Sequence, residues 1–450
     1  MITLIVTSFA YCIKHLINIY LYSVLFIIVN TWIGLDFGLS RIYVQLLDKL
    51  FKLIEKNEKF FFHQTKSSAE LKVGNETESK SKINGYTKQE VESFFTAKSP
   101  DHWNLLTSTL RPKGQNEDRQ LTFLGKVLFT FGLFLRFGLL FPIRLLLLAY
   151  TLLQTIVVVV NLAYVLPANK FRDLYYNFCW RLTFRLFAQN FGCYFNYHGT
   201  HNCHQAGGVA VANHTGPIDI IALGEHIRYS FMGRRRNGLL GYLYSTLEVC
   251  GGNVWFDLSE KETIKERLRS RVHDPVSYPL VVFPEGTCTT TDCILRFRKG
   301  AFELGCSAYP IAIKYDLRYG NPFWNSKHIG FLGLCVKLFT NWSIVGDIYY
   351  LPPVNKKESE SCIEFSLRVQ GLIADQIGLK KVDLDGYTIK YGNCNNNNSE
   401  ENDKSFQSSE TIVETINQQS ATIGSKNTFS HHANQSLGLG LNGELITRSY

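Results

Sequence analysis

The first 166 residues of the chain contain two long apolar stretches that are separated by a polar one. From Met1 to Ile33 the residues are apolar apart from Lys14, His15 and a few hydroxyl and amide side chains. This stretch is longer than the apolar core of a signal peptide, so the pattern predicts a membrane anchor over residues 1–33. A cleaved signal peptide is the alternative interpretation.

Residues 34–120 combine one amphipathic segment with a polar connector. Between Arg41 and Ile54 the apolar residues recur at helical spacing, which predicts a helix whose apolar face lies on a membrane or on a protein core. Core packing is the commoner reason for such a face. Residues 64–120 are rich in Lys, Glu, Ser and Gly, so we expect a mostly exposed connector with short helices.

The second long apolar stretch covers residues 121–166. Its run from Leu145 to Leu166 is just long enough to cross a bilayer, and Lys126 and Arg144 are placed to reach lipid head groups. A proline inside a helix removes a hydrogen bond, so Phe141-Pro142 predicts a bend between two helices that form a transmembrane or re-entrant hairpin. A hairpin buried in a soluble protein is the alternative, although few soluble helices stay apolar over such a length.

From residue 171 to residue 390 short apolar runs alternate with polar and helical stretches, which is typical of an α/β domain. The expected strands are Gly208–Ala212, Asn253–Phe256, Leu280–Phe283, Tyr309–Tyr315 and Trp342–Leu351. The predicted fold is therefore α/β, with a central mixed sheet flanked by helices and preceded by an N-terminal membrane-associated hydrophobic helical hairpin. Residues 391–450 are rich in Asn and Ser, and we expect them to be disordered.

Composition narrows the possible partners without selecting one. The chain of 450 residues carries a formal net charge of +9, which suits phosphate-bearing partners such as coenzyme A or anionic lipid. Its basic clusters lack the interleaved aromatic residues of nucleic-acid-binding segments, so DNA and RNA are not expected partners. The eleven cysteines include no Cys-x-x-Cys pair, which argues against a disulfide framework and a zinc site and favours a reducing compartment.

The first candidate for chemistry is a histidine and an aspartate that follow an apolar strand. Val209 to Ala212 lead into Asn213-His214-Thr-Gly-Pro217-Ile-Asp219, and Pro217 suits the first turn of a helix. Asp219 then lies one helical turn on and points back at the imidazole. A carboxylate on one ring nitrogen fixes the tautomer, so the other nitrogen can take a proton from an attacking hydroxyl. His214 and Asp219 are the predicted catalytic pair, and a structural histidine is the alternative.

A second apolar strand ends in Phe283-Pro-Glu285-Gly286-Thr287-Cys288. Active-site groups in α/β sheets gather at the carboxyl ends of strands. We expect Glu285 and Thr287 to hold acceptor hydroxyls, and Gly286 lets the backbone approach a ligand. An ordinary strand-to-loop turn is the alternative. Cys288 is expected to be a small core residue and not a nucleophile.

Two basic clusters accompany these motifs. One is Arg234 to Arg236, and the other contains Arg296, Arg298 and Lys299. Arginine and lysine pair with phosphate oxygens, so Arg234, Arg236 and Lys299 are candidate substrate-binding residues. A solvated charged surface is the alternative for at least one of the two clusters.

Together these motifs resemble the blocks of the microsomal glycerol-3-phosphate acyltransferases, a family of the wider lysophospholipid acyltransferase superfamily. Asn213–Asp219 is similar to the family's first block, Phe283–Cys288 to its third and Tyr309–Tyr315 to its fourth. The segments Phe297–Glu303, Phe323–Ser326 and Tyr350–Pro353 also fit, and the likeness extends roughly from Gly34 to Gly386. Several blocks in the right order make a specific match.

The resemblance implies an acyl-CoA-dependent O-acyltransferase of glycerolipid synthesis, which acylates glycerol-3-phosphate at the sn-1 hydroxyl to give lysophosphatidate. His214 would take the hydroxyl proton, and Asp219 would orient the imidazole. Glu285, Gly286 and Thr287 would bind the acceptor, and Pro310 would shape the acyl or thioester end of the pocket. Acyl-CoA is a co-substrate, and neither a cofactor nor a metal is expected.

The resemblance also implies a location. We expect the protein in the endoplasmic reticulum membrane, with the active site facing the cytosol and the lipid bilayer as a partner. The substrate acyl chain and the product are lipids, which an apolar hairpin would allow to enter and leave through the membrane.

One block departs from the family pattern. Where the family has an arginine thought to hold the acceptor phosphate, the segment after Val254-Trp-Phe256 reads Asp257-Leu258-Ser259. Leucine cannot pair with phosphate, and Arg234 to Arg236 are the residues expected to compensate. Two alternatives follow: a lysophospholipid such as lysophosphatidate as the acceptor, and a catalytically weak membrane-bound binder of acyl-CoA or lipid.

Overall fold

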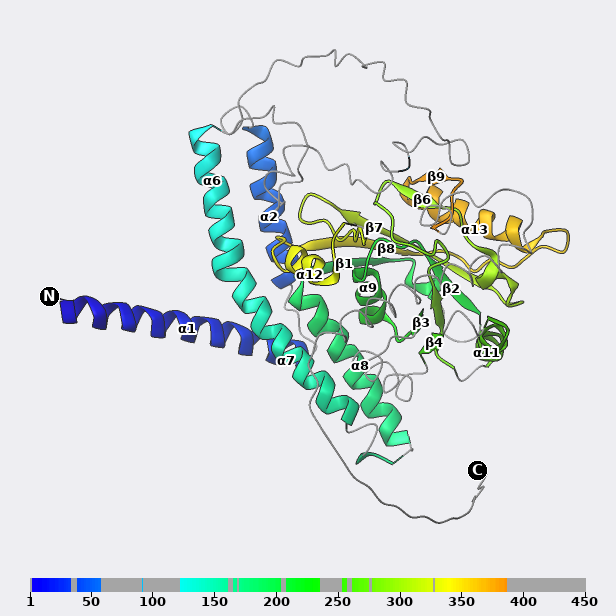
Figure 1. Ribbon diagram of the computed structural model, residues 1–450, viewed down its shortest axis with the longest axis horizontal. Coiled ribbons are helices and arrows are strands. Elements are labelled where there is room, and N and C mark those ends of the chain that lie inside the picture. The colour runs from blue at the N-terminus through cyan, green and yellow to red at the C-terminus, as the bar shows by residue number, and fades with distance from the viewer. Residues whose placement is uncertain are drawn as a thin grey trace, which may run out of the picture. The chain divides into compact units, whose positions relative to one another are not determined.

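A computed structural model describes the chain in several stretches. These are residues 2–33, 39–57, 91, 122–160, 165–167, 170–203, 208–234, 253–256, 261–274, 277–326 and 328–386. Most of the predicted connector and the predicted disordered tail lie outside the described residues, as do Arg235, Arg236 and Leu258. The architecture below concerns the described stretches alone (Figure 1).

Within the described residues, the centre of the α/β domain is a seven-stranded sheet of order β1-β8-β7-β2-β5-β3-β4. Its strands are β1 (Cys193–His198), β2 (Val209–Ala212), β3 (Ser230–Arg234), β4 (Val254–Phe256), β5 (Leu280–Val282), β7 (Ala308–Asp316) and β8 (Ile344–Tyr350). The β7–β8 pair is antiparallel and the other neighbours are parallel, which confirms the predicted mixed sheet. A separate parallel pair joins β6 (Cys293–Leu295) to β9 (Lys380–Val382).

Helices cover both faces of the sheet. They are α8 (Lys170–Asn190), α9 (Ile218–His226), α11 (Lys261–His273), α12 (Phe331–Phe339) and α13 (Cys362–Ile377), with short 3₁₀ helices η3 (Thr200–Asn202) and η4 (Lys299–Glu303). Ala210 and Ala212 of β2 pack with α8, α9 and α12, whereas Val209 and Val211 pack with α11 and α13. Successive strand side chains point to opposite faces, so β2 is buried on both sides and reads as a continuous apolar run.

The N-terminal helices are α1 (Ile2–Ile33), α2 (Leu39–Lys56), α6 (Phe123–Phe134), the π-helix η1 (Leu135–Leu140) and α7 (Phe141–Val160). The predicted division into two hairpin helices at Phe141-Pro142 is not found, because α6, η1 and α7 follow one another as a single helical segment. Residues Phe123–Val158 of this segment are long and apolar enough to cross a membrane.

The helix continues through Pro142 because two features compensate for the N–H that proline lacks. Immediately before the proline, the π-helix η1 replaces the ordinary bonding pattern, and the Phe141 N–H bonds to the Arg136 carbonyl five residues earlier. The Gly138 carbonyl, which Pro142 cannot serve, accepts a hydrogen bond from the Tyr20 hydroxyl of α1. The helix therefore continues past Pro142 with a local change of helix type.

Arg144 attaches this helix to the α/β domain. It was predicted to reach lipid head groups, but it is 4% exposed. Its guanidinium donates to the carbonyls of Phe339, Asn341 and Trp342 at 2.7, 2.6 and 2.8 Å. These carbonyls lie at and just beyond the carboxyl end of α12, where a cation complements the helix dipole. The apolar helix is thus fixed to the domain that carries the candidate site.

Candidate active site

The predicted catalytic pair lies at the carboxyl end of β2, near the middle of the sheet. The strand ends at Ala212, and Asn213 then exchanges two hydrogen bonds with the backbone of Ile313 in β7, at 2.9 and 2.8 Å. Helix α9 begins at Ile218, so Asp219 lies in its first turn. An acid at this position is favoured by the helix dipole. The sequence therefore folds into the strand, turn and helix that the motif predicted.

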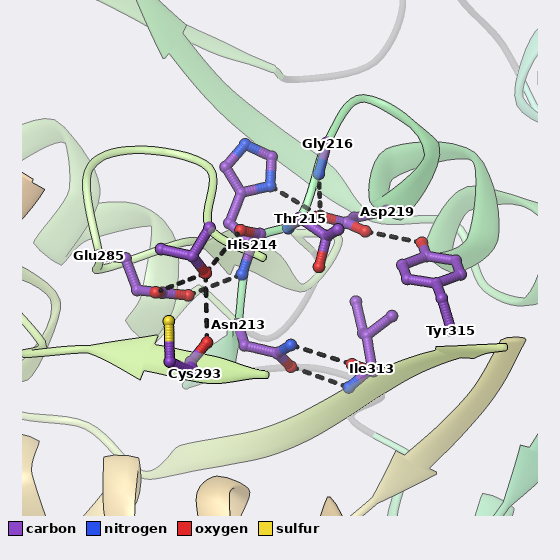
Figure 2. A network of polar contacts seen from close by, with 10 residues as sticks. Asn213, His214, Thr215, Gly216, Asp219, Glu285, Cys293, Ile313 and Tyr315 are labelled. Carbon is purple, nitrogen blue, oxygen red and sulfur yellow. Dashed lines mark hydrogen bonds and ion pairs between the residues drawn. The ribbon is translucent and has the colours of Figure 1, made fainter. Parts of the chain in front are cut away.

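The imidazole of His214 and the carboxylate of Asp219 are in direct contact. The distance from His214 Nδ1 to Asp219 Oδ2 is 2.8 Å. Asp219 Oδ2 also accepts from the backbone N–H groups of Thr215 and Gly216, at 2.6 and 3.0 Å, and Oδ1 accepts from the Tyr315 hydroxyl at 2.6 Å. Figure 2 shows the carboxylate between the ring and Tyr315. Because Asp219 has no exposed surface, these bonds fix both the carboxylate and the ring.

The surroundings of the His214 ring control its charge. The side chain is 20% exposed and stacks on Phe283, with ring centroids 4.3 Å apart. Burial lowers the pKa of the imidazole, but Cys288 and Asp219 raise it, and the resulting pKa lies well above its ordinary value. A proton that reaches this ring is therefore strongly stabilised.

A second buried carboxylate, Glu285, fixes the backbone of the same histidine. Its Oε1 accepts from the His214 N–H at 2.8 Å, and its Oε2 accepts from the Leu295 N–H at 2.9 Å and the Thr289 hydroxyl at 3.2 Å. The Thr289 N–H donates in turn to the His214 carbonyl at 2.8 Å. Glu285 has no exposed surface, and burial raises its pKa to about 7. The turn after β5 therefore holds the backbone of His214 in place through hydrogen bonds to its N–H and carbonyl groups.

Comparison with known proteins identifies the family. The model of the family described as Acyltransferase matches residues 194–314. Glycerol-3-phosphate acyltransferase 3 of Danio rerio is 31% identical over 345 residues, which cover 76% of this chain and 75% of that protein. Glycerol-3-phosphate acyltransferase 4 of Homo sapiens is 34% identical over 300 residues, covering 66% of this chain and 64% of that protein. The chain belongs to the microsomal glycerol-3-phosphate acyltransferase family.

The protein is accordingly an acyltransferase of glycerolipid synthesis, as the motifs indicated. Among solved structures, the chain is similar to the 1-acyl-sn-glycerophosphate acyltransferase of Thermotoga maritima, with 17% identity and a TM-score of 0.35, covering 52% of this chain and 95% of that one. This likeness is too low to assign roles to residues.

The acyltransferase places the other predicted substrate residues in different settings. Gly286 is exposed at the turn after β5 and has φ of +73°, a conformation that favours glycine. Thr287 is half-buried beside it. Both positions remain open to a ligand. Glu285 has no exposed surface and its oxygens accept bonds from the protein, so its predicted contact with an acceptor hydroxyl is not found.

Pro310 lies back from the level of His214 along the sheet. Pro310 is buried within β7, where it pairs with Val211. Asn213 contacts Ile313, which is three residues further along β7. At about 3.3 Å per residue, Pro310 therefore lies roughly 10 Å along the strand from Ile313. Lys299 pairs with Glu303 at 3.1 Å. Arg234 ends β3, while Arg236 and Leu258 lie outside the described residues.

Sequence reasoning gave no role to three residues that support the acyltransferase site. Tyr315 donates to Asp219, Thr289 binds both Glu285 and the His214 backbone, and Phe283 stacks on the imidazole. Tyr315 and Phe283 stand inside the motif blocks, so their position was a usable signal. Thr289 gave no such signal.

Two further observations concern a cavity elsewhere in the fold and possible metal ligands. A cavity of about 580 Å³ lies at the amino ends of β2 and β7, lined by Gly208, His273, Ser307 and neighbours, and so away from His214. In the stretches that the structure describes, no three His, Cys, Asp or Glu side chains are grouped as metal ligands would be.

Proposed function

We propose that this acyltransferase transfers a fatty acyl group from acyl-CoA to the sn-1 hydroxyl of glycerol-3-phosphate, giving lysophosphatidate. The observation that carries the proposal is the 2.8 Å contact between His214 Nδ1 and the fully buried Asp219 carboxylate. The relatives at 31% and 34% identity carry the name of the same reaction.

The proposed chemistry is a direct transfer with His214 as general base. With the Nδ1 proton held by Asp219, Nε2 accepts the proton of the acceptor hydroxyl while that oxygen attacks the thioester carbonyl. The carbon–sulfur bond then breaks, and the thiolate of coenzyme A takes the proton back from the imidazolium. A positioned base contributes about 10² to 10⁴ in rate, and holding the two substrates together contributes more. The reaction balances without a metal, a cofactor or a covalent acyl-enzyme.

The turn after β5 supplies the acceptor contacts in this proposal. Gly286 and Thr287 lie at its surface, next to the Glu285 that binds the His214 backbone. The apolar segment Phe123–Val158 would bring lipid substrates to this edge of the sheet from a membrane. Within that proposal, the membrane is that of the endoplasmic reticulum, and the site faces the cytosol.

Lysophosphatidate as acceptor is the second candidate. The observation in its favour is Leu258, which stands where the family pattern has an arginine. A non-catalytic binder of acyl-CoA is disfavoured, because binding alone gives no reason to hold an imidazole on a buried carboxylate.

The test is an acyl-transfer assay on membranes that carry the full chain. Labelled acyl-CoA is supplied with glycerol-3-phosphate or with lysophosphatidate, to wild type, His214→Ala and a control, His198→Ala. We expect label in lysophosphatidate, a loss of roughly 10³-fold or more in His214→Ala, and no loss in His198→Ala. Equal labelling by His214→Ala and wild type would overturn the proposal, and transfer to lysophosphatidate alone would select the second candidate.

A further inference from the structure

The basic cluster after β6 contains one cation that differs from its neighbours. Arg296 Nη1 pairs with Asp383 at 3.3 Å, and Lys299 Nζ pairs with Glu303 at 3.1 Å. The exposed Arg298 guanidinium has no ion pair and no hydrogen bond to any of the described residues. It is therefore the member of this cluster that is available to an anion.

Arg298 is also held next to the turn after β5, the turn that binds the backbone of His214. Its backbone N–H donates to the Pro284 carbonyl at 3.0 Å. Its Cδ and Nη1 atoms lie 3.6 and 4.0 Å from the position that a Cβ on Gly286 would occupy. The guanidinium thus lies along the exposed backbone of Gly286. The preceding residue, Glu285, binds the His214 N–H at 2.8 Å, so two short links connect Arg298 to the catalytic loop.

We propose that Arg298 binds a phosphate group of a substrate at the open side of the turn after β5. The inference rests on the proposed function, and it replaces the predicted role of Lys299, whose charge is already paired. A guanidinium can bind two phosphate oxygens at once, and at this position it supplies the cation that Leu258 does not. The ligand is a phosphate monoester, either that of the glycerol-phosphate acceptor or the 3′-phosphate of coenzyme A.

The test is equilibrium binding to the full chain in lipid nanodiscs, which requires no turnover. Labelled glycerol-3-phosphate, coenzyme A and 3′-dephospho-coenzyme A are titrated against wild type, Arg298→Gln and Arg298→Lys. Arg296→Gln and Lys299→Gln are matched controls, because they remove the same charge from the same cluster.

We expect Arg298→Gln to weaken binding of one phosphate monoester by about 10- to 100-fold, with Arg298→Lys intermediate and both controls within about twofold of wild type. A loss confined to glycerol-3-phosphate assigns the acceptor phosphate. A loss for coenzyme A that is absent for its 3′-dephospho form assigns the 3′-phosphate.

Three results would overturn the inference: unchanged binding of all ligands by Arg298→Gln, an equal loss in the two controls, or no binding of any of these ligands by wild type. Failure of the proposed function gives a different signature. In that case His214→Ala transfers acyl groups as well as wild type does, while Arg298→Gln still weakens phosphate binding.

Discussion

Two His–Asp pairs in this molecule make contacts of similar length in different surroundings. His214 Nδ1 lies 2.8 Å from Asp219 Oδ2, and His198 Nε2 lies 2.9 Å from Asp347 Oδ1. Both rings also stack on an aromatic neighbour, Phe283 at 4.3 Å and Tyr349 at 4.4 Å. The contact distance and the ring stacking therefore do not separate them, although the ring nitrogen in contact differs.

The carboxylates do separate them. Asp219 is 0% exposed and has three further donors, whereas the Asp347 side chain is 37% exposed and its Oδ1 has one further donor, Asn196. An exposed ion pair is screened by water and contributes little, while a buried one fixes its partner. Position differs as well, because His214 follows the central strand β2 and His198 ends the edge strand β1. The pair that we propose as catalytic is thus the one whose acid is buried beside the central strand of the sheet.

The largest effect is expected from breaking the buried pair. Asp219→Asn leaves the side chain in place but removes the charge that fixes the imidazole, so we expect acyl-transfer kcat to fall about 10² to 10⁴-fold. The same change at the exposed pair, Asp347→Asn, should leave kcat within about twofold. Similar losses in the two variants, measured with equal amounts of membrane-inserted protein, would show that burial does not distinguish the pairs.

Glu285→Gln is expected to have a smaller effect, which appears in stability as well as in rate. In the variant, the amide nitrogen is a donor and would face one of the N–H groups from which the carboxylate now accepts a hydrogen bond. This lost bond should lower the free energy of unfolding by about 1–3 kcal/mol. We expect kcat/KM to fall roughly tenfold and the thermal unfolding midpoint to drop. Glu303→Gln, at a half-buried acid paired with Lys265 and Lys299, is the control and should change neither.

The raised pKa of Glu285 predicts how the stability of the protein changes with pH. Burial raises the pKa of Glu285 from 4.5 to about 7, so the native state binds more protons than the unfolded state between these values. Its contribution to stability is present below pH 4.5 and is lost as pH rises through 7. The fall in unfolding midpoint over this range should be smaller in Glu285→Gln than in wild type. An identical fall would mean that Glu285 is ionised in the native state.

The smallest effect is expected at Cys288, although it lies near the His214 ring. Direct transfer needs no thiol nucleophile, so Cys288→Ser should keep kcat within about fivefold of wild type. Loss of activity as complete as in His214→Ala, together with an acylated Cys288 detected in wild type by mass spectrometry, would instead point to a covalent intermediate.

The sequence predicted those parts of the site that depend on neighbours along the chain. The five expected strands correspond to β2, β4, β5, β7 and β8, and the strand–turn–helix around His214 was predicted as found. These features follow from periodicity and from local turn and helix-start signals.

Features set by distant contacts were not predictable. Glu285 had the same pattern as His214, a polar residue after an apolar strand, but the Leu295 N–H and the His214 backbone determine its buried role. Pro142 signalled a boundary between two helices, but Tyr20, far away in sequence, compensates for the lost bond. Arg144 was predicted to bind lipid head groups because the neighbouring sequence does not indicate its actual partner, the Phe339 carbonyl. In each case the deciding partner is more than ten positions away or on another element.

The central claim is that the buried Asp219 helps to control the protonation of a catalytic His214, and the pH dependence of kcat/KM tests it most directly. A general base acts when it is neutral, so activity rises as pH passes the pKa of the imidazole, which Cys288 and Asp219 together hold above its ordinary value. We predict that this rise moves to lower pH in Asp219→Asn and stays in place in Asp347→Asn. A rise at the same pH in wild type and Asp219→Asn would contradict the account.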